Sequence, residues 1–312
     1  MTTLLTFRDN IKAFVSRYDY IFTPIGKGIL AFIIFYSLNS QLGYLSVLGK
    51  PFLLLLIAVV CAFLPLEIIA GISAIFIILH SFKVTMDVAL LSFAVIMIFY
   101  CGYMRFLPKT GIIALLIPIF YACHLIYAVP VVIGFLIGPA AIVPAAFGIL
   151  LYYYCGAVAD LVKVLAATTE EDEAVQGFQY VLTELIQNKE MILTIGIFAV
   201  VILVAYLIYR SSFEHAWMVS FLVAGFLNIV LFLIGSVTLS IEVSIGSILI
   251  ESVVGVLIAA LLQFWKGIVD YQRTEILQFE DDDYYYYVKA VPKLSVAESN
   301  KNVKHINSKT HN

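Results

Sequence analysis

Long runs of hydrophobic residues alternate with short polar stretches along most of this 312-residue chain. Six runs are long enough to cross the ~30 Å hydrocarbon core of a bilayer, which takes roughly 20 residues of helix. They cover residues 22–40, 85–104, 140–162, 191–209, 215–237 and 243–267. None alternates polar and apolar residues as a membrane strand would, so we predict an all-α, polytopic transmembrane helix bundle.

Two further apolar stretches are interrupted by proline, which removes a helical hydrogen bond. Pro65 divides residues 51–82 into pieces of about 14 and 17 residues, which are short for full crossings. Pro130 interrupts residues 111–139 in the same way. We interpret both stretches as re-entrant hairpins with Pro65 and Pro130 at their tips, which gives about six spans and two hairpins. The alternative treats every piece as a span and gives about nine crossings.

The distribution of Lys and Arg favours the hairpin interpretation, because cytoplasmic flanks of membrane helices attract these residues. With six spans and two hairpins, both termini are expected in the cytoplasm. The cytoplasmic flanks would then carry Arg8, Lys12, Arg17, Lys27, Arg105, Lys109, Arg210, Lys266 and Arg273, and the outer flanks Lys50, Lys83, Lys163 and Lys189. Nine crossings would move Arg210, Lys266 and Arg273 outside and weaken the bias.

Two polar stretches keep a helical spacing of apolar residues and are predicted to be amphipathic surface helices. In residues 1–20, Leu4, Phe7 and Phe14 share a face opposite Arg8. Residues 168–188 begin with an acidic cluster, which favours a helix start, and continue with an apolar stripe. Such helices suit the bilayer interface, so membrane lipid is an expected partner of both.

The chain is thus divided into residues 1–20, a transmembrane domain over 21–268, and a tail over 269–312. The tail holds the acidic block Glu280–Asp283 and then Tyr284–Tyr287. Tyrosines of this kind favour β structure and suit binding to the membrane interface or to a protein partner. A solvated tail with no binding role is the alternative.

The composition agrees with membrane insertion. The residues are 62% hydrophobic and 12% charged, which is far more apolar than one soluble core requires. We expect a multi-pass protein of the cytoplasmic membrane. The net charge of -3 gives no reason to expect a nucleic-acid partner. The four cysteines lie within apolar runs without CxxC or Cys/His spacing, so we expect no disulfide, metal or cofactor.

Ionisable residues inside apolar runs are the candidate functional residues, because each requires a partner or water within the membrane. Glu67 follows Pro65 by two residues, and Glu251 lies well inside the last span. His124 approaches the second predicted hairpin tip. If the two tips meet, Glu67, His124 and Glu251 would surround one polar site that couples to a substrate or an ion. The alternative is that each residue is hydrogen-bonded separately within the helix bundle.

Four segments carry a resemblance to a known group of proteins: "VDYQRTEILQFEDDDYYYYVKAVPK", "RFLPKTGIIALLIPI", "IYAVPVVIG" and "QNKEM". The chain resembles a family of uncharacterised polytopic membrane proteins from anaerobic Gram-positive bacteria. The tail is the most specific part of this similarity. The resemblance implies class and location, and it supplies no catalytic residues.

These patterns favour a transporter-like permease that moves a small solute, coupled to protons or cations through Glu67 and Glu251. The alternative is a non-transporting membrane scaffold that recruits partners through its surface helices and tail. A third interpretation is an intramembrane enzyme that acts on lipid. The chain contains no HExxH, GxSxG, P-loop or GxGxxG motif, so no catalytic residue is predicted.

Overall fold

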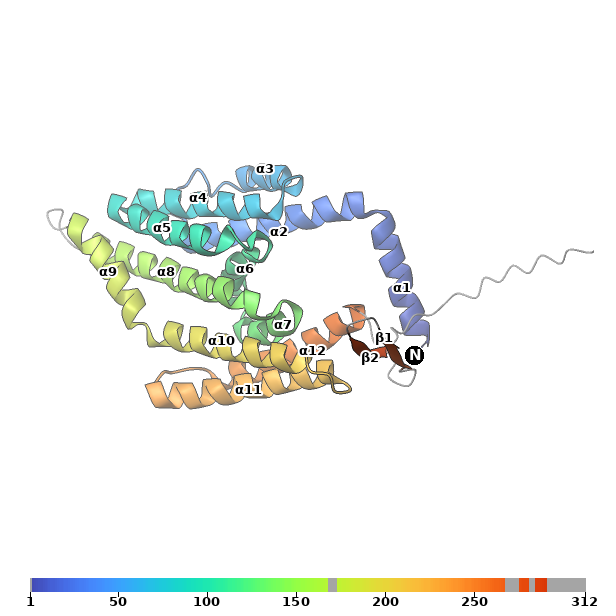
Figure 1. Ribbon diagram of the computed structural model, residues 1–312. Coiled ribbons are helices and arrows are strands. Elements are labelled where there is room, and N and C mark those ends of the chain that lie inside the picture. The colour runs from blue at the N-terminus through green and yellow to red at the C-terminus, as the bar shows by residue number, and fades with distance from the viewer. Residues whose placement is uncertain (1, 168–172, 267–274, 281–283, 291–312) are drawn as a thin grey trace, which may run out of the picture. The chain divides into compact units, whose positions relative to one another are not determined.

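The computed structural model describes residues 2–167, 173–266, 275–280 and 284–290, and these are mostly helical (Figure 1). The predicted all-α class is confirmed. The α-helices are α1 (Thr2–Arg17), α2 (Asp19–Leu42), α3 (Pro51–Ala62), α4 (Leu66–Val84), α5 (Met86–Phe99), α6 (Ile112–Ala122), α7 (Val129–Leu136), α8 (Ile142–Ala167), α9 (Glu173–Gln187), α10 (Lys189–Tyr209), α11 (Ala216–Leu239) and α12 (Ile245–Lys266). Shorter elements are the π-helical turn η1 (Tyr100–Met104), the 3-10 helices η2 (Pro108–Thr110), η3 (Ile126–Ala128) and η4 (Gly138–Ala141), and the strands β1 (Glu275–Glu280) and β2 (Tyr285–Ala290).

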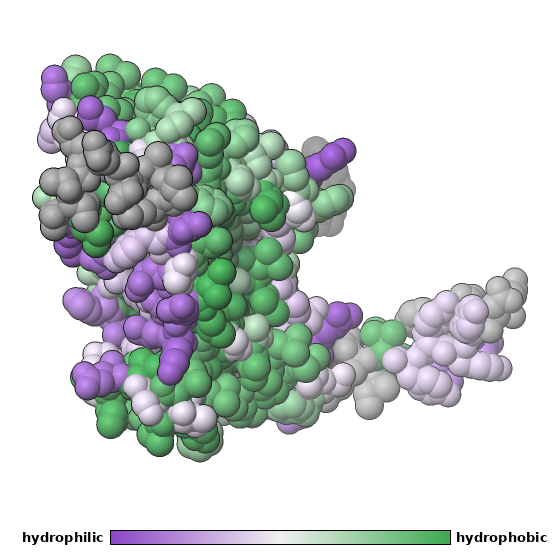
Figure 2. Space-filling model, turned by 90° about the vertical axis from the view of Figure 1, so that its left-hand side faces the viewer, coloured by the Kyte–Doolittle hydropathy of each residue, from purple (hydrophilic) through white to green (hydrophobic). Residues whose placement is uncertain are grey.

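Seven helical segments in the described part of the chain are long and apolar enough to cross a membrane. Six of them coincide with the predicted spans. The seventh is α4, which has 19 residues and is longer than the hairpin interpretation allowed. Hydrophobic residues cover broad areas of the surface, whereas hydrophilic residues gather on a limited part of it (Figure 2). These apolar areas are suited to contact lipid tails.

The bundle itself is one compact unit of residues 20–263, and residues 1–19 and 264–312 belong to a second unit. Within the bundle, hydrogen bonds at both ends of α4 show how α2, α3 and α4 are arranged. The Lys27 ammonium of α2 donates to the Leu64 carbonyl, just before α4, at 3.3 Å. The Leu45 N–H, just after α2, donates to His80 Nδ1 in the second half of α4 at 3.2 Å. The chain from Leu45 to Leu64 therefore traverses most of the length of α4.

The proline at residue 65 begins a helix. Pro65 is exposed at the N-cap of α4 with φ −59°, a value that proline adopts without strain. Glu67 lies in the first turn of the same helix and is half-buried. A carboxylate in this position is favoured by the helix dipole. Local helix geometry therefore explains why both residues are tolerated here.

The second interrupted stretch forms two short helices, α6 and α7. The turn between them lies at Cys123–Leu125, and His124 adopts a left-handed conformation there with φ 52°. Pro130 is buried in the first turn of α7, so it is not at the tip where it was expected. Gly148 of α8 lets the backbone of α6 approach, since a Cβ atom there would lie 2.6 Å from the Ala114 carbonyl oxygen.

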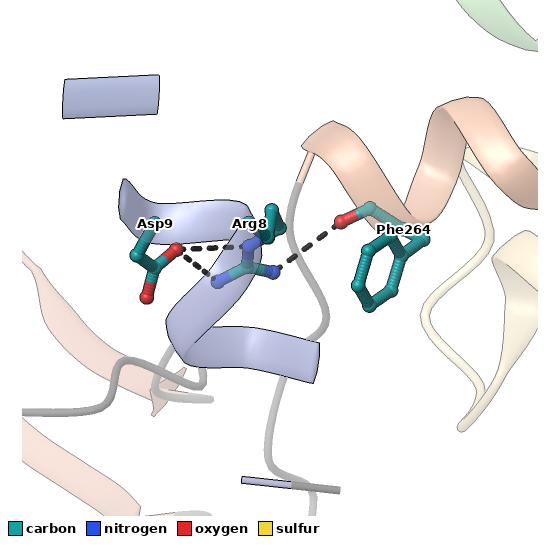
Figure 3. A network of polar contacts seen from close by, with 3 residues as sticks. All are labelled: Arg8, Asp9 and Phe264. Atoms are coloured by element: carbon teal, nitrogen blue, oxygen red, sulfur yellow. Dashed lines mark hydrogen bonds and ion pairs between the residues drawn. The ribbon is translucent and has the colours of Figure 1, made fainter. Parts of the chain in front are cut away.

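The second unit contains α1 and the strand pair. The Arg8 guanidinium is buried: it pairs with Asp9 at 2.8 Å and donates to the Phe264 carbonyl at 3.3 Å (Figure 3). The sequence placed Arg8 on the face of α1 opposite the apolar stripe. In the structure, the Arg8 side chain on that face contacts protein. Leu4, Phe7 and Phe14 remain exposed, as a surface helix requires.

The strands β1 and β2 form an antiparallel hairpin in which Glu275 pairs with Ala290 and Glu280 with Tyr285. Tyr285 and Tyr287 share one face of β2 and are exposed. The predicted surface helix over residues 168–188 is present as α9. The first residues of the predicted helix, and most of the predicted tail, lie outside the residues that the structure describes.

Candidate functional site

A polar site in the bundle is built around Glu251, which projects from the second turn of α12 and is 5% exposed. Its Oε2 atom accepts a hydrogen bond from the Tyr127 N–H at 3.0 Å. The Ile126 N–H lies close to the same carboxylate. Both donors lie in η3, directly after the turn that separates α6 from α7. The first N–H groups of a helix have no partner within it, so the broken element presents them to Glu251.

Asn228 of α11 binds the other side of the same backbone segment. Its amide nitrogen donates to the Tyr127 carbonyl and to the Ser252 hydroxyl, both at 2.9 Å. Asn228 is fully buried, and its Oδ1 atom has no hydrogen-bond partner among the residues that the structure describes. A buried polar group of this kind is costly to leave unpaired, so the acceptor is suited to bind a proton donor or a cation.

Close packing holds α12 against the broken element. Gly255 lies one helical turn after Glu251, and a Cβ atom there would lie 2.8 Å from the Cα atom and 2.9 Å from the carbonyl oxygen of Ala128. These are backbone atoms, which cannot rotate away. Glycine at this position is therefore needed for Glu251 to reach the Tyr127 N–H.

The structure brings together two of the three predicted coupling residues. His124 is exposed in the turn and lies within electrostatic range of Glu251. In the described part of the chain, no hydrogen bond or ion pair joins Glu67 to either residue. The site therefore combines Glu251 with the 124–127 segment, and its remaining members are Asn228, Ser252 and Gly255.

These additional residues were missed because their sequence signals are weak. Asn228 is the one amide side chain within the α11 run, and Gly255 follows Glu251 by four residues, which puts both on one helix face. A helical projection of α12 would have grouped Glu251 with Gly255. The contact with residues 126–128 has no local signal, because it joins segments far apart in the chain.

Another buried polar network has a structural role. The Ser92 hydroxyl of α5 donates to the Ser81 hydroxyl of α4 at 2.8 Å and also contacts the Tyr154 hydroxyl of α8. All three side chains are buried. Because each hydroxyl has a partner, this network connects three helices and offers no open binding position.

Among the described residues, neither a metal-binding group of side chains nor a cysteine thiol forms part of the site. Within the described ranges, no group of three or more His, Cys, Asp or Glu residues could hold a metal ion. Cys61 and Cys155 are buried as expected, whereas Cys101 and Cys123 are exposed. Cys123 lies in the turn beside the site without contacting Glu251.

Comparison with known proteins gives no family assignment. No protein-family model matches the chain, and no curated protein or solved structure matches it. The resemblance to membrane proteins of anaerobic Gram-positive bacteria therefore stays a prediction.

Two opposite influences act on the Glu251 carboxylate. Burial disfavours a charged group, whereas two N–H donors and a nearby histidine favour it. The Asn228 Oδ1 atom adds a second oxygen acceptor across the Tyr127 peptide. The arrangement is suited to bind a proton or a monovalent cation reversibly.

Proposed function

We propose that this protein is a transporter-like permease of the cytoplasmic membrane that moves a small solute, with protons or cations coupled through Glu251. The observation that carries the proposal is the hydrogen bond between the buried Glu251 carboxylate and the Tyr127 N–H at the break between α6 and α7. Transporters use interrupted helices in this way, because their free backbone groups and buried carboxylates form the ion site near the membrane centre.

The proposed topology treats α6 and α7 as a re-entrant hairpin and lets α3, with the loop before it, cross back alongside α4. The chain then crosses eight times, since seven long helices and α3 each contribute one crossing. An even number keeps both termini on one side, and the Lys and Arg bias makes that side cytoplasmic.

Cysteine labelling tests this topology after the four native cysteines are replaced. The change Ser211→Cys places a thiol between α10 and α11, and Glu184→Cys places one on α9. In intact cells, an impermeant reagent should label position 184 and leave position 211 unmodified. Labelling at 211 would support nine crossings and contradict the proposal.

The coupling role is tested with Glu251→Gln, which keeps the size of the side chain and removes its charge. In lipid nanodiscs, the infrared carboxyl band that appears on acidification should be reduced in Glu251→Gln. The matched control is Glu242→Gln, an exposed residue in the loop before α12. Glu67→Gln should also behave as the wild type, because Glu67 lies at a helix start.

Transport is measured in proteoliposomes that contain a trapped pH-sensitive dye. A panel of amino acids, sugars and amines is added outside, and a solute that is carried with protons changes the internal pH. Glu251→Gln should abolish this change, and Glu242→Gln should keep it. If Glu251→Gln retains full solute-dependent proton movement, the coupling proposal is wrong.

The second candidate is a membrane scaffold, which the exposed tyrosines of the strand hairpin favour. A two-stranded hairpin is marginally stable alone and offers unpaired edges to another strand. Truncation after Thr274 removes both strands and should leave the unfolding temperature of the bundle unchanged. Absence of transport in the full chain, together with a protein partner that is lost on this truncation, would favour the scaffold interpretation.

A further inference from the structure

A second polar cluster inside the bundle consists of three tyrosines from two helices. Tyr121 of α6 stacks on Tyr152 of α8, with ring centroids 3.8 Å apart and ring planes within 3°. Tyr153 stands edge-on to both rings, at 5.9 Å from Tyr121 and 5.3 Å from Tyr152. The perpendicular arrangement fixes all three rings in position.

A carboxylate lies beside these rings. Glu190 is in the first turn of α10, within electrostatic range of Tyr121, Tyr152 and Tyr153. Thr194, one turn further along α10, donates its hydroxyl to the Glu190 carbonyl at 2.8 Å. Among the residues that the structure describes, no Lys, Arg or His forms an ion pair with Glu190. Glu190 is therefore the acidic side chain beside the three rings, and it is not held in an ion pair within the described part of the chain.

Tyr152 and Tyr153 also line a cavity of about 300 Å³. The other lining residues are Gln41, Cys155, Gly156 and Ala159. The Gln41 Oε1 atom is buried and has no hydrogen-bond partner in the described residues, while its amide nitrogen donates to the Ser37 hydroxyl at 3.2 Å. The cavity thus offers aromatic rings and an unused acceptor, and the Glu190 carboxylate lies within electrostatic range of those rings.

We infer that this cavity binds a small organic cation, such as a quaternary ammonium ion or a protonated amine. Aromatic rings attract cations electrostatically, and desolvation strengthens the attraction. Glu190 supplies the opposite charge, and the Gln41 carbonyl accepts an N–H or O–H group. The volume is at the small end of ligand pockets, which suits a compact molecule. Metal cations such as Ca²⁺ and Mg²⁺ require several oxygen ligands, and no carboxylate is among the residues that line this cavity.

Choline and its neutral isostere, in which a tert-butyl group replaces the trimethylammonium group, test the inference. Both have the same shape, and their binding to the full chain in nanodiscs is measured by calorimetry. Choline should bind about tenfold more tightly than the isostere, because the charge interacts with the rings and with Glu190. No choline binding, or equal affinity for the two compounds, would overturn the inference.

Variants locate the binding. Glu190→Gln should weaken choline binding about tenfold, and Tyr152→Leu should weaken it several-fold. Glu184→Gln, an exposed carboxylate on α9, is the matched control and should bind normally. The unfolding temperature of each variant shows that it is folded. Unchanged choline affinity in folded Glu190→Gln would contradict the proposed site.

Choline binding is tested separately from the coupling role of Glu251, because choline affinity is measured without transport. Glu251→Gln should keep its choline affinity within about twofold, since Glu251 does not line the cavity. Failure of choline binding leaves the Glu251 proposal intact, and failure of proton coupling leaves the cation site intact.

Discussion

Replacing Gly255 by alanine tests whether the contact between α12 and the broken element holds Glu251 in place. The added Cβ atom would lie 2.8 Å from the Ala128 Cα atom, about 0.6 Å closer than the 3.4 Å at which ordinary contacts begin. The neighbouring atoms are backbone, so the two elements must move apart by a comparable distance. The hydrogen bond from Tyr127 to Glu251, now 3.0 Å, would then lengthen beyond the normal range.

The expected loss of stability is about 1–3 kcal/mol, the usual result of overpacking a close contact. Alanine has a higher helix propensity than glycine, by up to about 1 kcal/mol, so the observed loss is smaller than the strain. Gly196→Ala in α10 is the matched control, because no atom lies within 4 Å of its added Cβ. This control should be neutral or slightly stabilising.

Unfolding is followed by the fluorescence of Trp217 and Trp265 in the same detergent. The double variant Gly255→Ala with Glu251→Gln completes the cycle: if the glycine acts through the carboxylate, the two effects should not add. A Gly255→Ala protein as stable as Gly196→Ala, with an unchanged infrared carboxyl band, would refute the proposed packing. Full additivity would show that Gly255 acts independently of Glu251.

Three further predictions concern the turn, the hydroxyl network and α1. His124→Gly should be more stable than His124→Val by about 1–2 kcal/mol, because φ 52° strains a β-branched residue; thermal unfolding of the pair measures the difference. Ser92→Ala should cost about 1–3 kcal/mol by leaving the buried Tyr154 hydroxyl with fewer partners, and combination with Tyr154→Phe should cost less than the sum of the single changes in the same assay. Arg8→Lys should speed amide hydrogen exchange in α1, because lysine cannot donate to Asp9 and Phe264 in the same fork; the exposed Lys12→Ala should leave the exchange rate unchanged.

The sequence determined the class of this protein and the position of most long helices. Membrane helices are encoded locally, because each must satisfy its own backbone hydrogen bonds and present apolar side chains over its whole length. This is why α2, α5, α8, α10, α11 and α12 coincide with the predicted runs. The amphipathic spacing that predicted α1 and α9 is likewise encoded within each segment.

Proline was harder to interpret from sequence. Pro65 and Pro130 each interrupt an apolar run, but proline is also favoured in the first turn of a helix. Pro65 precedes a full-length α4, and Pro130 lies inside α7 beyond the true turn at His124. The tyrosine pattern of residues 284–287 indicated β structure, but the pairing with β1 depends on a partner strand that the pattern does not name.

The site itself was decided by tertiary structure. Glu251 was identified as a buried ionisable residue from its position in α12, but its partner is the backbone of Tyr127, and a peptide group has no side-chain signature. The Tyr121 and Tyr152 rings meet because α6 packs against α8, and Glu190 lies beside them at the start of α10. Hydropathy records how much apolar surface a segment must bury, whereas helix packing decides which polar groups meet inside it.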